Sequence, residues 1–219
     1  CGSKESELTF NKIECLKFLR DKGIKTAKST SFKKNTEIKS EKIQKEIGFP
    51  CFIKASKSGS SFGVYKVYNQ EEFIDCLNSA FEIDDEILVE TFIEGREFSI
   101  GVLTYKNKVT VLPITEIIAS NDFFDYEAKY EGKSQEITPA KIDDKLKDKL
   151  NKISKDIYNI IGLKGFSRSE FIVNKDGIYF LETNTVPGLT SESILPQQAQ
   201  HAGISLEDLF ANSIYEVIK

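Results

Sequence analysis

The chain has 219 residues, of which 40% are hydrophobic and 29% charged, and its formal net charge is −4. This composition is ordinary for a globular protein and is sufficient for one large domain or two small ones with a sizeable core. Lysine and arginine are dispersed, so nothing indicates a nucleic-acid-binding surface. No apolar run approaches the ~18 residues that a membrane-spanning helix needs.

The first half of the chain alternates helical and strand patterns. Apolar residues at helical spacing predict one helix over residues 8–22, which Gly23 would end, and a polar connector rich in Lys and Ser follows it. The later predictions in this half are a short helix ending at Gly48, antiparallel strands at 51–54 and 64–68, and a helix at 71–81.

The second half continues in the same way. We predict strands at 86–93, 96–105 and 109–117, a helix at 143–161, a hairpin at 170–183 that turns at 175–177, and short helices at 195–203 and 205–219. Helices and antiparallel strands are therefore interleaved, which predicts an α+β fold and not a doubly wound parallel sheet.

The four cysteines, Cys1, Cys15, Cys51 and Cys76, are far apart and form no C-x-x-C pair. The last three lie within apolar patterning and are interpreted as small buried hydrophobic residues, which favours a reducing, cytoplasmic location. The chain begins at Cys1 and contains no Met. We therefore expect it to be a portion of a longer polypeptide.

A loop of small residues, Ser58 to Ser61 and then Gly63, joins the strands at 51–54 and 64–68, and Lys54 stands just before it. Glycine lets backbone N–H groups approach an anion closely, so the loop suits a phosphate. It is not a Walker loop, because no Gly-Lys-Ser/Thr ends it, and not a dinucleotide fingerprint, because a strand follows it. The alternative interpretation is a mobile hairpin loop.

Four polar residues occupy the predicted hairpin near the end of the chain. Arg168 and Glu170 share one strand face, as do Glu182 and Asn184. Two carboxylates and an amide oxygen beside an arginine suit Mg²⁺, whose ligands are oxygen atoms often shared with phosphates. A solvated charged face is the alternative, although charges next to an apolar strand pair are costly unless they are paired or bind a ligand.

The segment "FFDYEAKYEGKSQEITPA" (123–140) is aromatic and acidic, with weak periodicity, and is predicted to be a loop. Lys129 and Tyr130 lie in it, and an ordinary surface loop is the alternative interpretation. His201 is the only histidine and is expected at the surface or as a helix cap, which argues against histidine-based catalysis and a zinc site.

Together, in this order and spacing, these clusters resemble the D-alanine–D-alanine ligase family of ATP-grasp enzymes. The resemblance rests on "FIKASKSGSSFGVYKV", "ILVETFIEGREFSIGVL", "FFDYEAKY" and "LETNTVPGLTSESILPQQAQHAGIS", and it extends from "LTFNK" at residue 8 to the last helix. It implies two α+β subdomains whose antiparallel sheets grip ATP, at residues 1–90 and 91–219.

The resemblance also implies roles for single residues at the nucleotide. Phosphate contacts fall on Lys12, Lys54 and Lys129, flap contacts on Ser60 and Ser61, the adenine hinge on Glu90, Phe92 and Ile93, and the ribose carboxylate on Glu97. The Mg²⁺ or Mn²⁺ ligands would be Glu170, Glu182 and Asn184.

At the reacting centre, the resemblance places Arg168 on the transferring phosphoryl group and Gly188 on the oxyanion. Ser60 and Tyr130 would position the first substrate, and Ser193 and Ile194 the second. The implied reaction joins two D-alanines through an acyl phosphate, for peptidoglycan precursor synthesis.

Three departures from the family pattern are visible. Glu170 stands where many members have Asp, Thr91 where many have Lys, and the family's amino-terminal domain is absent from the chain. Alternative functions are a ligase that forms D-alanyl-D-serine or D-alanyl-D-lactate, against whose lactate form Tyr130 argues, or an ATP-binding module without turnover. The expected partners are small molecules, without nucleic acid or membrane, and a homodimer is left open.

Overall fold

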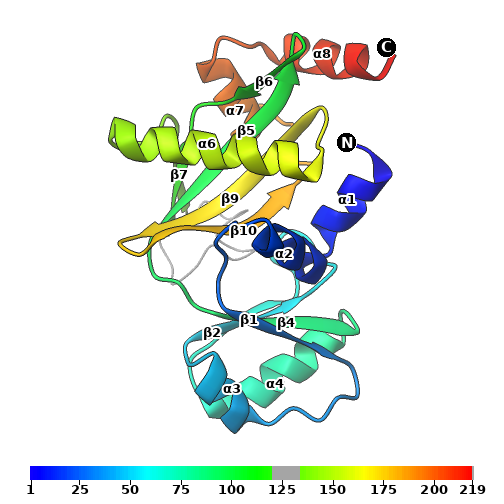
Figure 1. Cartoon of the computed structure of the whole chain (residues 1–219), viewed down its shortest axis with the longest axis vertical. Helices are drawn as coiled ribbons and strands as arrows, with labels where there is room; N and C mark the ends of the chain where they lie inside the picture. The colour runs from blue at the N-terminus through cyan, green and yellow to red at the C-terminus, as the bar shows by residue number, and fades with distance from the viewer. Residues whose placement is uncertain (120–133, 219) are drawn as a thin grey trace.

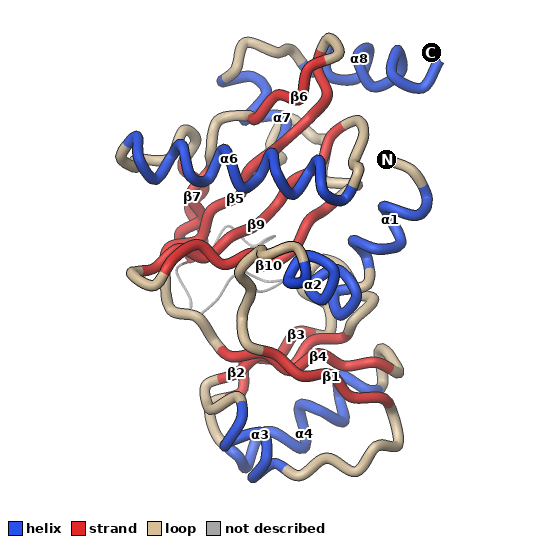
Figure 2. Tube along the Cα trace, in the orientation of Figure 1, coloured by secondary structure: helices blue, strands red, loops and turns tan. Residues whose placement is uncertain are grey.

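The computed structural model describes residues 1–119 and 134–218. Two sheets lie one beyond the other along the long axis of the molecule, and loops pass between them (Figures 1 and 2). The elements are α1 (Ser3–Phe10), α2 (Lys12–Asp21), β1 (Ser29–Lys33), α3 (Ser40–Glu46), β2 (Cys51–Ala55), β3 (Val64–Val67), α4 (Gln70–Phe81), β4 (Glu86–Thr91), β5 (Arg96–Tyr105), β6 (Lys108–Val111), β7 (Thr115–Ala119), β8 (Ser134–Ile137), α6 (Asp144–Ile161), β9 (Phe166–Asn174), β10 (Gly177–Asn184), α7 (Ile194–His201) and α8 (Leu206–Ile218).

The smaller sheet has the strand order β1-β4-β2-β3, with antiparallel neighbours. Helices α3 and α4 cover one face of it, where Ile43 and Phe73 pack against the buried residues of β2 and β4. Strand β2 alternates strictly between buried and half-buried positions, so Cys51, Ile53 and Ala55 enter this core. Its other residues, Phe52 and Lys54, therefore face the larger sheet.

The larger sheet has the order β10-β9-β5-β7-β8, and β6 pairs with the far end of β5. Helix α6 crosses one face (Figure 1) and buries an apolar stripe against the Phe98 and Phe171 side of the sheet. Asp143 caps the start of this helix, and Gly162 ends it in the left-handed conformation, with φ of 81°. Helix α7 packs on the opposite face, against Leu103 and Leu112.

Helices α1 and α2 precede the smaller sheet in the sequence but contact the larger one. Both contact β10, and Cys15, Leu16 and Leu19 of α2 belong to the same core as Phe171. The division of the chain at residues 90 and 91 remains a prediction. In the part of the chain that the structure describes, no helix is both long and apolar enough to cross a bilayer.

The prediction of a single helix over 8–22 is wrong, because the helix is interrupted at Asn11. Its ψ of 99° is extended, and its Oδ1 accepts hydrogen bonds from the Glu14 N–H and the Ser56 hydroxyl. A short polar side chain that caps a helix in this way competes with helix continuation. The result is two helices, α1 and α2, with a cap between them.

The strand predicted over 109–117 is also two strands. Residues 108–111 form β6 and residues 115–119 form β7, since Pro113 removes a ladder donor between them. The polar connector contains β1, and the predicted loop over 123–140 contains β8 at residues 134–137. The strand predicted to reach residue 93 ends at Thr91, where the linker to β5 begins.

Candidate active site

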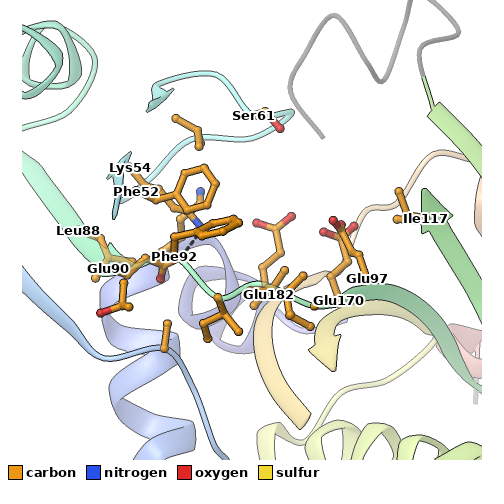
Figure 3. A pocket seen from close by; sticks show the side chains of 18 of the residues that line it. Phe52, Lys54, Ser61, Leu88, Glu90, Phe92, Glu97, Ile117, Glu170 and Glu182 are labelled. Carbon is orange, nitrogen blue, oxygen red and sulfur yellow. Dashed lines mark hydrogen bonds and ion pairs between the residues drawn. The ribbon is translucent and has the colours of Figure 1, made fainter. Parts of the chain in front are cut away.

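A cavity of about 500 Å³ lies between the two sheets. Strands β2 and β4 and the small-residue loop supply one side, and β5, β7, β9 and β10 supply the other. Figure 3 shows Phe52, Lys54, Glu90 and Phe92 on the first side and Glu97, Glu170 and Glu182 on the second. The cavity therefore has a cationic and aromatic side opposite a carboxylate side.

Lys54 and Glu90 form a buried ion pair at the cavity wall. Their side chains are 17% and 6% exposed, and Lys54 Nζ lies 2.5 Å from Glu90 Oε1. Burial alone would lower the pKa of Lys54, but the Glu90 carboxylate, with help from Glu182 and Glu97, raises it above the ordinary value. Lys54 is therefore held as a cation inside the cavity.

The loop from Ser58 to Ser61 lines the cavity above Lys54. Ser60, Ser61 and Gly63 have positive φ angles of 51°, 59° and 72°. Backbone N–H groups of residues with such angles can point together into a concavity that binds anions. Glycine adopts a positive φ easily, and serine adopts it less readily. Lys12 of α2 donates to the Ser58 carbonyl at 2.5 Å and so brings a second cation to the same loop.

An apolar slot lies beside the Lys54–Glu90 pair. The rings of Phe52 and Phe92 have centroids 6.0 Å apart and are tilted by 54°. Leu16, Ala27 and Leu88 complete its walls. Such a slot, with polar groups at one end, suits a flat heterocycle.

Register brings the carboxylates together on the larger sheet. Glu170 of β9 lies opposite Glu182 of β10, and Arg168 lies opposite Asn184. Strand β10 has a bulge between Phe180 and Glu182, where Leu181 is the extra residue. Without that bulge, Glu182 would share the face of Phe180, which packs in the α6 core. The bulge therefore turns Glu182 towards the cavity.

Arg168 lies beneath these carboxylates. Its Nη1 is 2.8 Å from Glu170 Oε1 and donates to Ser99 Oγ at 3.0 Å. Glu170 Oε1 is buried and lacks a hydrogen bond of good geometry in spite of this ion pair. A buried carboxylate oxygen of this kind is costly unless a cation completes its surroundings.

The donor set fits a hard divalent cation. Asn184 Nδ2 donates to Glu182 Oε1 at 3.3 Å, so the amide oxygen of Asn184 lies on the other side of that group. Two carboxylates and one amide oxygen match the oxygen ligands that Mg²⁺ takes. Among the described residues, no three His, Cys, Asp or Glu side chains form a metal cluster by themselves.

The predicted residues do not all line the cavity. Ten of them do so: Lys12, Lys54, Ser60, Ser61, Glu90, Phe92, Ile93, Glu97, Glu170 and Glu182. Arg168 and Asn184 contact it through the two carboxylates. Ser193 and Ile194 lie at the start of α7, where Ser193 Oγ is 2.8 Å from Thr190 Oγ1, and Gly188 lies in the preceding loop, close to Ser193. Lys129 and Tyr130 lie outside the described residues.

Arg96 and Glu116 also line the cavity, and sequence reasoning missed both. Arg96 donates to both Glu116 oxygens, from Nε at 2.7 Å and from Nη2 at 2.9 Å. This pair ties the start of β5, next to Glu97, to β7. The sequence gives little indication of this pair, because an arginine and a glutamate 20 residues apart become neighbours only through the β5–β7 register.

Two antiparallel α+β units that enclose a cavity lined by residues suited to bind phosphate and a divalent metal define the ATP-grasp class. The family model described as "D-ala D-ala ligase C-terminus" matches residues 18–215. The chain therefore belongs to the family of D-alanine–D-alanine ligase carboxyl-terminal regions. 

Curated relatives agree with that assignment. The chain is 54% identical over 214 residues to a D-alanine–D-alanine ligase of Flavobacterium johnsoniae and 50% identical to one of Christiangramia forsetii. Each alignment covers 98% of this chain and 66% of the relative. The chain thus spans about two thirds of the length of these relatives.

Solved structures share the fold. The VanG D-Ala:D-Ser ligase of Enterococcus faecalis matches with a TM-score of 0.86 at 34% identity, covering 98% of this chain and 63% of that one. The Bacillus anthracis D-alanine–D-alanine ligase complexed with ATP matches with a TM-score of 0.83 at 28% identity, covering 98% and 68%.

Proposed function

We propose that the chain is the ATP-binding and ligating part of a D-alanine–D-alanine ligase. The observation that carries the proposal is the cavity itself, which opposes Lys12, Lys54 and the Ser58–Ser61 loop to the carboxylates Glu170 and Glu182. Curated relatives at 54% and 50% identity carry the same name. The ATP complex of the Bacillus anthracis relative supports ATP as the nucleotide.

The cavity divides naturally into a base end and a phosphate end. The base would occupy the slot between Phe52 and Phe92, and the Glu97 carboxylate would accept the ribose hydroxyls. Lys54 and Lys12 would neutralise the phosphates under the small-residue loop. Phosphoryl transfer depends mostly on positioning and charge neutralisation, which this set of cations and backbone donors provides.

The reaction would proceed in two displacements. A carboxylate oxygen of the first D-alanine attacks the γ-phosphorus, and the bond to ADP breaks to leave an acyl phosphate. The amine of the second D-alanine then attacks the acyl carbon, loses a proton and expels phosphate. Arg168 would hold the transferring phosphoryl group, and Ser193 would bind the carboxylate of the second substrate.

Glu170, Glu182 and the Asn184 oxygen would hold Mg²⁺ or Mn²⁺. That ion supplies charge neutralisation between the phosphates. The protein's own part is to present the two carboxylates at one register position and to keep Arg168 beside them.

Four free cysteines support a reducing, cytoplasmic location.

A second candidate is a ligase that joins D-alanine to D-serine. The D-Ala:D-Ser ligase structure, with a TM-score of 0.86 at 34% identity, is compatible with this candidate. The two candidates differ only in the side chain of the second substrate, which would lie near Ser193 and Ile194. Competition between D-alanine and D-serine as the acceptor distinguishes them.

Turnover by matched variants tests the proposal. In the native polypeptide that carries these residues, Glu182→Gln should lose most ATP-dependent D-alanyl-D-alanine formation and remain folded. Glu207→Gln, an exposed position on α8, should retain it. Near-normal kinetics in the Glu182 variant would contradict the site assignment.

A further inference from the structure

The edge of β5 that faces β6 and β7 has a gap. Strand β7 pairs with Glu97–Ser99, and β6 pairs with Val102–Tyr105 on the same edge. Between these two ladders the chain leaves the sheet at 112–114, and the Leu112 N–H donates to the Gly101 carbonyl at 2.8 Å. The Gly101 N–H therefore needs a partner from elsewhere, and the Ser99 carbonyl, at the end of the β7 ladder, can accept a second donor.

Gln198 of α7 supplies that partner. Its Oε1 accepts from the Gly101 N–H at 2.9 Å, and its Nε2 donates to the Ser99 carbonyl at 2.8 Å. The side chain is 0% exposed. A primary amide that accepts from one residue and donates to the residue two before it makes the two bonds that one residue of a parallel neighbouring strand would make. Gln198 thus replaces the missing length of neighbouring strand.

The space for this amide depends on Gly101. A Cβ at that position would lie 2.7 Å from Gln198 Oε1, 2.8 Å from Leu112 Cδ1 and 2.9 Å from Leu195 Cδ1. The glycine and the glutamine are therefore matched to each other, because only a residue without a side chain lets the amide reach the strand.

The hydrogen bonds continue from Gln198 to the carboxylate site. Ser99, whose carbonyl accepts from Gln198, accepts from Arg168 Nη1 through its hydroxyl. Arg168 in turn contacts Glu170. In the other direction, Gln198 Nε2 also donates to Thr115 Oγ1 at 2.9 Å. Gln198, Ser99 and Arg168 each have hydrogen-bond partners in this network, and such buried networks hold their groups in one geometry.

Gln198 also sets the place of α7. That helix begins at Ile194, directly after its N-cap Ser193. A side chain fixed to β5 one turn into the helix holds the helix start against the same strand that supports Arg168.

We propose that Gln198 is a positioning residue that couples the placement of Arg168 to the placement of the Ser193 end of α7. The inference rests on the proposed function for the roles of Arg168 and Ser193. Loss of the Gln198 amide would displace the phosphoryl-transfer arginine and the acceptor site together. It would leave the nucleotide slot, on the other sheet, in place.

Steady-state kinetics of the native polypeptide provides the first test. Gln198→Met retains side-chain length and volume but loses the three hydrogen bonds, and Gln200→Met, an exposed position on the same helix, is the matched control. We expect kcat to fall ~10- to 100-fold, since small misplacements of catalytic groups have effects of this size. The KM for the acceptor amino acid should rise, and the KM for ATP should stay within about twofold.

Arginine side-chain NMR provides a second test that does not depend on turnover. The chain has three arginines, Arg20, Arg96 and Arg168, so their guanidinium signals can be assigned by substitution. In Gln198→Met the Arg168 signals should shift or broaden, as they should in Ser99→Ala, and those of Arg20 should not. Gln198→Glu, which cannot donate to the Ser99 carbonyl, should resemble Gln198→Met.

These outcomes distinguish a failure of the proposed function from a failure of the coupling through Gln198. Absence of dipeptide formation by the unsubstituted native polypeptide would overturn the proposed function, and the NMR result would still decide the coupling. Unchanged Arg168 signals in Gln198→Met would overturn the coupling. A fall in apparent kcat in proportion to unfolded protein, with both KM values unchanged, would show that Gln198 is only part of the scaffold and would also overturn it.

Discussion

Removing the charge of Lys54 should destabilise the protein far more than removing an equally close but exposed charge. Lys54→Met leaves the Glu90 carboxylate, 6% exposed, without its partner. Breaking one side of a buried pair costs roughly 3–5 kcal/mol, because the remaining charge stays desolvated. For a chain of this size, each kcal/mol lowers Tm by ~2–4 °C, so a fall of about 6–20 °C is expected.

The chain contains a matched control for this experiment. Lys152 and Asp156 on α6 also lie 2.5 Å apart, but their side chains are 78% and 42% exposed. An exposed i,i+4 pair contributes ~0.3–0.5 kcal/mol, so Lys152→Met should change Tm by no more than about 2 °C. Burial is thus the variable that differs between the two substitutions.

Thermal and urea denaturation of both variants give the comparison. The double variant Lys54→Met/Glu90→Gln should recover part of the loss, because the uncompensated carboxylate is then gone. Lys54→Met should also bind a non-hydrolysable ATP analogue more weakly by about 1.5–3 kcal/mol, roughly 10- to 150-fold. If Lys54→Met costs no more stability than Lys152→Met, the buried-pair argument fails.

Four further outcomes are expected. Backbone hydrogen exchange over residues 56–63 should slow when MgATP is added, whereas equal protection in both states would identify the loop as a structural turn. The exposed Cys1 thiol should react with a disulfide reagent in the folded protein, and Cys15 and Cys51 should react only on unfolding, because burial raises the pKa of both to about 12. These raised pKa values favour folding fully below about pH 9 and lose that effect as pH rises towards 12, so alkaline urea titrations should show falling stability. Calorimetry with an ATP analogue should show that the 219-residue chain binds nucleotide, while a dipeptide assay of the same chain shows essentially no product; robust ligation would place the substrate site elsewhere.

Much of the fold followed from period-two and helical patterns. The strand pair at 51–54 and 64–68, the α6 helix and the β9–β10 hairpin were predicted correctly, because each has an apolar face that the pattern reveals. Strand β1 was missed because its residues, Ser29–Lys33, are mostly polar and lie at a sheet edge, where pairing with β4 and not burial determines the structure.

The candidate site was predictable where its residues share one strand or one loop. Arg168 and Glu170, or Glu182 and Asn184, could be placed on common faces from spacing alone. The bulge at Leu181 could not be predicted, because it follows from the requirement that Phe180 and Glu182 face opposite sides of the sheet. The role of Gln198 could not be predicted either, since a glutamine on a helix gains it only by lying beside a gap in the pairing of a strand that is distant in the sequence.

Isotope transfer from substrate to product tests the central claim most directly. D-alanine labelled with ¹⁸O in its carboxylate should be incubated with ATP, Mg²⁺ and the native polypeptide, and the released phosphate examined by ³¹P NMR. An acyl phosphate formed by the D-alanine carboxylate predicts one ¹⁸O in each phosphate released per D-alanyl-D-alanine. Unlabelled phosphate, or phosphate release without dipeptide, would contradict the account.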